Sequence, residues 1–248
     1  MPLNWAVQQM RVSLFSSEPI SLSEEVWRVI TQQEEAETRT AIPNGKQYSG
    51  KFSGGLLVVA YSGLRCDIVL NIDDTLADST EEPKLPVIGM WNDLSESFLK
   101  FISPFLESLE FPLVRIALGS VLVLEVASKE DAYRQLDKLL ESVQIDPENM
   151  RELTYRVNWP AKSSVIKGLE LNRLTTWNAV NISRTVMQMT GSEMTVAGAG
   201  KEIHTVRLEL DHNTVLTHKT PFEKSVRLPI FKELVALARE NAEKGECR

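Results

Sequence analysis

Three histidines, His204, His212 and His218, lie within fifteen residues of one another, and Asp211 stands beside the middle one. Imidazole and carboxylate groups are ligands of zinc and general bases, so this segment is the first candidate for chemistry. A β-hairpin turning at residues 211–213 would bring His204 roughly opposite His218, which makes a metal-dependent hydrolase one hypothesis. Because spacings of eight and six residues do not match metal ligands on a helix, we favour three surface histidines and predict no metal site.

Three other motifs could carry chemistry, and each has a simpler structural interpretation. Cys66 would be a nucleophile only with a histidine folded against it, so a buried thiol is expected. The small-residue run at 197–200 lacks the Lys-Ser/Thr of a phosphate loop and predicts a flexible turn. Asp73, Asp74 and Asp78 lack the regular spacing of a calcium loop. The sequence therefore predicts no catalytic residue and no cofactor.

Composition places the chain among ordinary folded proteins. Of 248 residues, 43% are hydrophobic and 25% are charged, which is typical of globular proteins. The longest apolar runs, at 56–61 and 121–127, are far shorter than the roughly 20 residues that cross a bilayer. The two cysteines, Cys66 and Cys247, do not form a disulfide framework. We therefore expect a cytoplasmic protein with no membrane partner.

Charge is distributed unevenly along the chain. The net charge is −7, and residues 1–110 carry 8 basic and 16 acidic side chains, whereas residues 151–227 carry 11 and 7. An acidic chain is a poor match for broad binding of nucleic acid, which depends on neutralising phosphates. A basic segment beside an acidic half favours recognition of a protein, or self-association of opposite charges. The simpler alternative is that this asymmetry is only surface composition.

The order of predicted elements occurs twice. Each copy begins with a long strand and a helix, continues with a meander of strands, and closes with a second helix. The first copy comprises 4–15, 21–38, 46–73 and 90–109, and the second comprises 112–127, 128–143, 151–218 and 222–243. The fold class expected is α+β, with two related modules in tandem, 1–110 and 111–248, and helices packed on one face of each antiparallel sheet.

Helix boundaries are marked by capping residues and prolines. The predicted capping pairs are Ser21 with Glu24, Ser128 with Asp131, and Thr220 with Glu223. A stripe of apolar and aromatic residues predicts that the face of 90–109 is core. Because proline lacks a backbone N–H, we expect Pro104 to kink or end that helix near Ser103 and Pro229 to divide the last helix.

Loops and bends are predicted within both meanders. The first strand alternates imperfectly, which indicates a bulge. Residues 73–84 are acidic and predict a mobile surface loop, and residues 192–200 predict a loop of small residues. Residues 168–189 predict two strands with a bend near 175–176.

Two segments carry a resemblance to a known family. The stretches RIALGSVLVLEVASKEDAYRQLDKLL and VNWPAKSSVIKGLELNRLTTWNAV, with a helix that starts at a tryptophan before them, resemble an uncharacterised family of bacterial proteins. Its members have similar lengths, are sporadically distributed, and often lie in mobile or phage-derived genomic islands. The resemblance covers most of residues 90–190. It implies a fold, and it supplies no active site to transfer.

The leading functional hypothesis is a non-enzymatic binding or assembly subunit. It would act through sheet surfaces with protein partners or as a homo-oligomer, in a mobile-element or phage-defence context. The candidate binding residues are Arg115, Arg156, Trp159, Arg173 and Trp177, because arginine and exposed aromatic side chains are preferred in interfaces. Strand alternation places Arg115 on the face away from the core, and we expect it to position a contact between modules or subunits.

The alternative is a nucleic-acid-binding component of a defence or mobile-element complex. In that case one sheet face would carry the tryptophans and the basic residues Arg156, Lys162, Lys167, Arg173, Arg184 and Arg207. Basic residues spread over both faces, or paired with acidic neighbours, would contradict this alternative.

Overall fold

A computed structural model describes residues 3–33, 35–73, 84–183, 185–190, 193–199 and 202–247. These residues form a large antiparallel sheet and four helices. The α+β class predicted from the order of elements is confirmed at this level. Every pairing between strands is antiparallel, as expected for chains that return through short turns.

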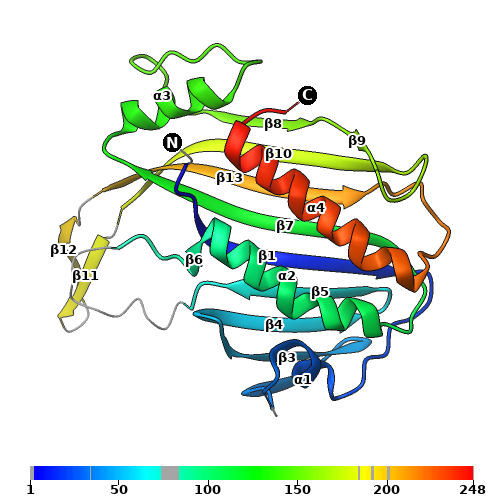
Figure 1. Cartoon of the computed structure of the whole chain (residues 1–248). Helices are drawn as coiled ribbons and strands as arrows, with labels where there is room; N and C mark the ends of the chain where they lie inside the picture. Colours follow the sequence, from blue (N-terminus) through cyan, green and yellow to red (C-terminus); the bar gives the residue numbers. More distant parts are fainter. Residues whose placement is uncertain are drawn as a thin grey trace.

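Strands from both halves of the sequence form one sheet (Figure 1). From the first half come β1 Ala6–Ser16, β2 Thr38–Ile42, β3 Gly45–Phe52, β4 Gly55–Ser62, β5 Arg65–Asn71 and β6 Gly89–Met90. From the second half come β7 Leu113–Val126, β8 Thr154–Asn158, β9 Ala161–Lys162, β10 Glu170–Ile182 and β13 Ile203–Thr214. The order is β2-β3-β4-β5-β1-β7-β13-β10-β8, with β6 on β1 and β9 on β10, so β1 and β7 join the halves at the centre.

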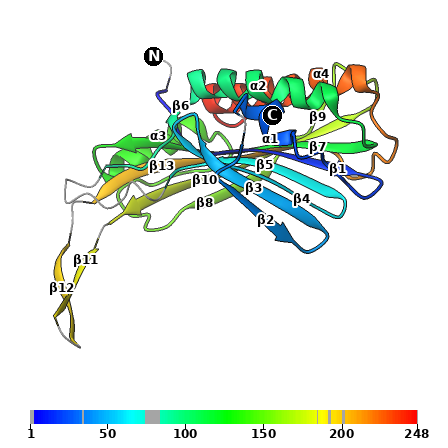
Figure 2. The same cartoon turned by 90° about the horizontal axis from the view of Figure 1, so that it is seen from below.

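Strands β11 Thr185–Thr190 and β12 Glu193–Ala199 form a separate two-stranded ribbon. Figure 2 shows this ribbon projecting from one end of the large sheet. Residues 193–199 were expected in a loop, and that prediction is wrong.

The helices are α1 Val26–Thr31, α2 Trp91–Ser108, α3 Lys129–Leu139 and α4 Lys224–Lys244. Figure 2 shows α2 and α4 lying side by side over one face of the sheet, which we call the covered face. No helix of the described residues lies over the other face, which we call the open face. The outer strands β2 and β8 lie farther from α2 and α4 than the central strands do, so the open face is concave.

The core lies between the covered face and the helices. Alternate residues of β1 point into it, and the predicted stripe of α2, including Trp91, Phe98, Ile102 and Phe105, is buried there. Burial of such large apolar side chains, each contributing roughly 1.5–3 kcal/mol, holds the two layers together. The expectation that the aromatic stripe is core is confirmed.

The first helix is shorter than predicted. It has six residues, its N-cap is Glu25, and no side chain caps it, so the capping pair Ser21–Glu24 is wrong. Beyond Thr31 the sequence offers one apolar residue before β2, and a longer helix would therefore bury little. Gln32 adopts a left-handed conformation that ends the helix.

Neither proline divides its helix. Pro104 lies inside α2, which does not end near Ser103, and Pro229 lies inside α4, so the predicted end and the predicted division are wrong. The kink at Pro104 stays a prediction. A proline in a helix costs roughly 3 kcal/mol, and several buried side chains on each helix outweigh that cost. The predicted capping box at Glu223 is also wrong, since this residue makes no side-chain cap bond. The cap at Ser128 is confirmed, because its Oγ accepts a hydrogen bond from the Asp131 N–H at 3.1 Å.

The second meander is built from longer strands than predicted. Strand β10 runs straight through 175–176, and β13 runs straight through 211–213, so neither the bend nor the hairpin exists. The two strands pair from Leu171 with Thr214 to Ile182 with Ile203, and this ladder satisfies backbone groups that a turn would leave free. The bulge in β1 is confirmed by a register shift after Val7. Most of the predicted loop at 73–84 lies outside the described residues.

Candidate functional site

Register brings charged residues of three strands together on the open face. Arg11 of β1 pairs with Gly119 of β7, which pairs with Asp211 of β13. In the next row, Glu209 of β13 pairs with Thr176 of β10, which pairs on its other side with Arg156 of β8. Because side chains two residues apart share a face, both rows point away from the helices.

These rows line a pocket of about 410 Å³, which we call the open-face pocket. Its polar lining comprises Gln9, Arg11, Arg156, Thr176, Glu209 and Asp211. The arginines come from β1 and β8, and the carboxylates come from β13 between them. The pocket therefore has cationic ends and an anionic middle.

Arg11 lies flat over Gly119. A Cβ atom at position 119 would stand 3.0 Å from Nη2 and 3.1 Å from Nε of Arg11. A side chain at that position would displace the guanidinium. Glycine thus supplies the space in which this arginine rests on the sheet.

The two arginines of the pocket lack partners, whereas its carboxylates have them. Glu209 lies 3.0 Å from Nε of Arg207, and Asp211 accepts a hydrogen bond from Asn213 Nδ2 at 3.2 Å. Among the described residues, neither Arg11 nor Arg156 makes an ion pair or a hydrogen bond, and Nε of Arg11 is buried. A buried donor without an acceptor costs about 1–3 kcal/mol, so an oxygen ligand is favoured here.

Arg115 also faces the open side, as predicted. Its guanidinium lies 4.9 Å above the ring of Phe15, its cross-strand neighbour on β1, and Arg65 approaches the same ring at 5.4 Å. Burial lowers the pKa of Arg115, and Asp211 opposes that shift. The contact of Arg115 among the described residues is thus with an aromatic ring. Leu113, two residues earlier on β7, is fully buried, and the register shifts beside it.

Trp177 and Arg173, both predicted as binding residues, lie on the covered face. Trp177 is 0% exposed and packs edge-on against Trp5 at 6.2 Å, so its predicted exposure is wrong. Arg173 is 7% exposed, and its Nη2 lies 3.4 Å from Oδ1 of Asn241 on α4. Neither residue can serve the open face. The sequence could not show this, because alternation alone does not say which face the helices cover.

Trp159 belongs to a third location, near the C-terminal segment. Its Nε1 donates to the Glu246 carboxylate at 2.8 Å, and the same carboxylate accepts from Tyr155 Oη at 3.0 Å and from the N–H and Oγ of Ser142. We call these four residues the C-terminal latch. Burial opposes ionisation of Glu246, but the hydrogen bonds outweigh it and hold its pKa below the ordinary value. No local pattern around Glu246 predicts this role.

The basic residues proposed for nucleic acid do not share one face with the tryptophans. Arg156 and Arg207 lie on the open face, Arg173 lies on the covered face, and Arg207 pairs with Glu209. Arg184 lies outside the described residues. Basic residues that are divided between the two faces, or paired with acidic neighbours, are unfavourable for a nucleic-acid surface.

The histidines are dispersed. His204 and His212 lie eight residues apart on one straight strand, a separation of about 26 Å. His204 bonds the Asn181 side chain, and His218 stacks on Phe222 with ring centroids 4.6 Å apart. The hairpin on which the hydrolase hypothesis depended is absent. Among the described residues, no three His, Cys, Asp or Glu side chains are grouped to hold a metal.

His212 and Cys66 are buried in the covered face, so the prediction of three surface histidines is wrong for His212. Burial, helped by the nearby Arg173, lowers the pKa of His212 to about 3, so its ring is neutral at physiological pH. Burial raises the pKa of the Cys66 thiol, and Asp67 adds to that effect. A neutral, fully buried thiol is a packing residue and not a nucleophile.

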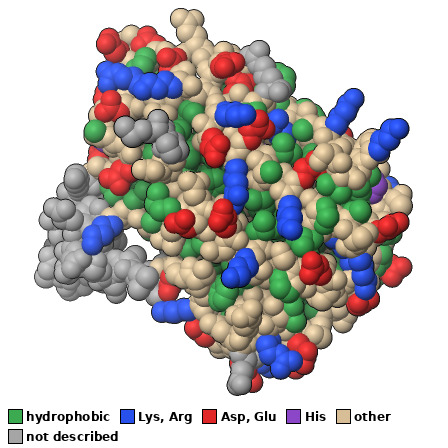
Figure 3. Space-filling view, in the orientation of Figure 1, with side chains coloured by type: hydrophobic (Ala, Val, Ile, Leu, Met, Phe, Trp, Pro, Cys, Tyr) green, Lys and Arg blue, Asp and Glu red, His purple; other side chains and the backbone are tan. Residues whose placement is uncertain are grey.

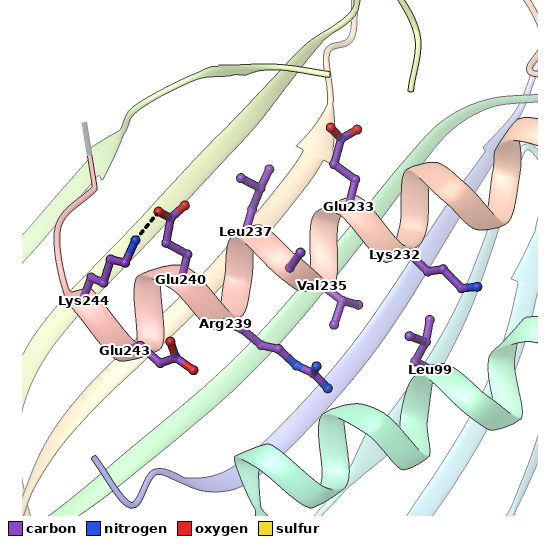
Figure 4. A pocket seen from close by; sticks show the side chains of 10 residues that line it. Leu99, Lys232, Glu233, Val235, Leu237, Arg239, Glu240, Glu243 and Lys244 are labelled. Atoms are coloured by element: carbon purple, nitrogen blue, oxygen red, sulfur yellow. Dashed lines mark hydrogen bonds and ion pairs between the residues drawn. The ribbon is translucent and has the colours of Figure 1, made fainter. Parts of the chain in front are cut away.

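A second depression, of about 440 Å³, lies between α2 and α4 (Figure 4). Its floor is apolar and its rim is charged, and most of the charges are already engaged within the chain. Arg239 donates to Ser95 of α2, and Lys244 pairs with Glu240 at 2.9 Å. Figure 3 shows acidic and basic side chains interspersed over this side of the molecule. This groove presents no comparable set of unpaired groups.

Comparison with known proteins leaves the function to be argued from geometry. No model of a known protein family matches this chain, and no curated protein matches it. In the described ranges, none of the helices has the length and apolar character that crossing a membrane requires.

Proposed function

We propose that this protein is a non-enzymatic binding subunit that holds a polypeptide partner, or a second copy of itself, on its open face. One observation carries the proposal: the open-face pocket contains two arginines, Arg11 and Arg156, without partners among the described residues. Guanidinium groups are enriched in protein interfaces because their five donors suit carboxylates and carbonyls. Arg156 is exposed to solvent, and Nε of Arg11 is buried without an acceptor among the described residues, so both guanidinium groups are available to a ligand.

The shape of the sheet supports the same conclusion. The open face is concave and uncovered by helices of the described residues (Figure 2). The covered face, in contrast, packs against the helices through the buried residues of the hydrophobic core. A concave polar surface with paired carboxylates and unpaired arginines can orient a partner without any chemical step. The chain resembles a family of bacterial proteins that often lie in mobile or phage-derived genomic islands. We therefore propose that the protein acts in the cytoplasm, in a mobile-element or phage-defence context.

Nucleic acid is the less favoured partner. Trp177 is buried and Trp159 is engaged in the C-terminal latch, so neither offers a stacking surface on the open face. Glu209 and Asp211 stand between the arginines and would repel phosphates. An acidic chain of net charge −7 adds to that repulsion.

The proposal includes two related modules that meet at β1 and β7. Each half begins with a central strand, β1 or β7, followed by a short helix, and ends with a long helix, α2 or α4. Arg115 lies across that seam on Phe15, which supports a role in positioning the halves or a second subunit. Superposing the halves of an experimental structure should align α1 on α3 and α2 on α4. A different helix order or opposite handedness would contradict the relationship.

Site-specific photo-crosslinking tests the binding function. The photoreactive amino acid p-benzoylphenylalanine would replace Thr176 on the open face, and in a matched control it would replace Lys232 on the outer side of α4. We expect polypeptide adducts from position 176 and few from position 232, and light scattering would show whether the partner is another copy. A monomer that gives no adduct at position 176 would contradict the proposal.

A further inference from the structure

The open-face pocket has a charge order that restricts its ligand. Arg11 and Arg156 stand on β1 and β8, which are four strand spacings apart, or about 19 Å between backbones. Glu209 and Asp211 stand on β13 between them. A ligand that spans the pocket therefore meets positive, negative and positive charge in turn.

The two kinds of group are not equally available. Arg207 forms an ion pair with Glu209 and Asn213 donates a hydrogen bond to Asp211, whereas the arginines at the ends have no acceptor among the described residues. The strongest new interactions would thus be formed by anionic oxygens at both ends. Charge-assisted bonds between guanidinium and carboxylate are short and can be bidentate.

The middle of the pocket excludes a uniformly anionic ligand. A phosphate chain would place negative charge against Glu209 and Asp211, and repulsion there would offset its gain at the ends. Phe15, an aromatic side chain of this face, is already covered by Arg65 and Arg115, so it offers no free ring to a base. A peptide can instead alternate carboxylates with an amine or with amide N–H groups.

Building on the proposed function, we infer that the open-face pocket recognises a mixed-charge segment of a polypeptide. One carboxylate of this segment binds Arg11 over Gly119, another binds Arg156, and a basic side chain between them faces Glu209 and Asp211. The ligand class is an extended peptide with acidic, basic and acidic side chains at alternate positions, because alternate side chains of an extended chain point to the same side.

The test uses the full-length protein and the capped pentapeptide acetyl-Glu-Gly-Lys-Gly-Glu-amide, in which the three charged side chains can face one side. Nuclear magnetic resonance would follow the side-chain Nε–H signals of Arg11 and Arg156, assigned with the variants R11M and R156M. We expect both signals to shift saturably, and acetyl-Lys-Gly-Glu-Gly-Lys-amide to bind at least about tenfold more weakly because its charges are reversed. A thymidine decamer is the third probe.

Three variants locate the effect. R11M should weaken binding of acetyl-Glu-Gly-Lys-Gly-Glu-amide about tenfold, a loss typical of a charged hydrogen bond. G119A should weaken it without removing a charge, since the new Cβ would displace the guanidinium. R65M is the matched control, because Arg65 shares the face but is paired with Asp67 at 2.7 Å. R65M should bind as the unchanged protein does.

The outcomes separate this inference from the function on which it rests. If no peptide shifts the two signals while adducts still form at position 176, the pocket inference is wrong and the binding function stands. If the decamer binds more tightly than the peptides, the ligand class is wrong. If R11M fails to fold, R156M and G119A still decide whether the pocket is the site.

Discussion

Arg227 and Arg11 show how differently the two sides of the sheet use the same side chain. In the helix layer, Arg227 is buried and donates to three backbone carbonyls, those of Phe222, Leu109 and Phe111, at 2.7–3.2 Å. On the open face, Arg11 lies over a glycine with its Nε unsatisfied by any described residue. Arg227 therefore stabilises the fold, whereas Arg11 keeps a guanidinium available to the ligand that we propose. The same type of side chain has a structural role in the helix layer and the proposed binding role on the open face.

Adjacent residues of β10 give the sharpest test of this contrast. Trp177 is 0% exposed on the covered face, and Thr176 lines the open-face pocket. W177A should lower the free energy of unfolding by about 3–5 kcal/mol, because it leaves a large cavity. T176A should change it by less than about 0.5 kcal/mol. Urea unfolding of both variants would measure the difference, and equal losses would remove the distinction between the faces.

Acid should weaken the covered face through His212. Its pKa is about 3 in the folded protein and about 6.5 when unfolded, so the unfolded chain binds a proton that the folded chain excludes. This contribution is complete above pH 6.5 and is lost as the pH falls toward 3, by at most about 1.4 kcal/mol per pH unit. H212Q should show a shallower pH dependence between pH 6.5 and 4. Parallel profiles for both proteins would contradict the expectation.

The C-terminal latch should contribute less than the core. E246Q replaces a carboxylate that accepts four hydrogen bonds and should lower the free energy of unfolding by about 1–3 kcal/mol. Because the pKa of Glu246 is depressed, this contribution is present above its ordinary value of 4.5 and is lost as the pH falls below it. The exposed Glu243 supplies the control, E243Q, which should leave the free energy of unfolding nearly unchanged.

Removing Arg115 should have a smaller effect on stability than the E246Q change. R115M keeps most of the volume and removes one cation–π contact with Phe15, worth about 0.5–1 kcal/mol. Light scattering and partner binding should change more than the melting temperature does. A variant that keeps its stability, its oligomeric state and its partner binding would show that Arg115 is only a surface charge.

Sequence patterns predicted well what depends on neighbouring residues. The α+β class, the cap at Ser128, the bulge in β1 and the buried stripe of α2 all follow from local propensity and periodicity. The predicted bounds of α1 were wrong, because the residues after Thr31 offer little apolar surface to bury. The predicted bend in β10 and hairpin in β13 were wrong, because pairing over a whole strand outweighs a local turn signal.

The candidate site was only partly accessible to such reasoning. The sequence places Arg115 on the correct strand face, yet it cannot show that Arg173 and Trp177 lie under helices. Arg11 was not identified at all. Its importance arises from Gly119, more than one hundred residues away, and from strand order, which no local pattern encodes.

The central pairing of β1 with β7 also has a consequence during synthesis. Strand β1 pairs with β5 on one side, and its other partner, β7, begins only at Leu113. At a translation rate of about 5–20 residues per second, the emerging first half shows an unpaired edge of β1 for seconds. A slow codon run before Leu113 would lengthen that interval, and two nascent chains on one messenger could then exchange strands at this edge.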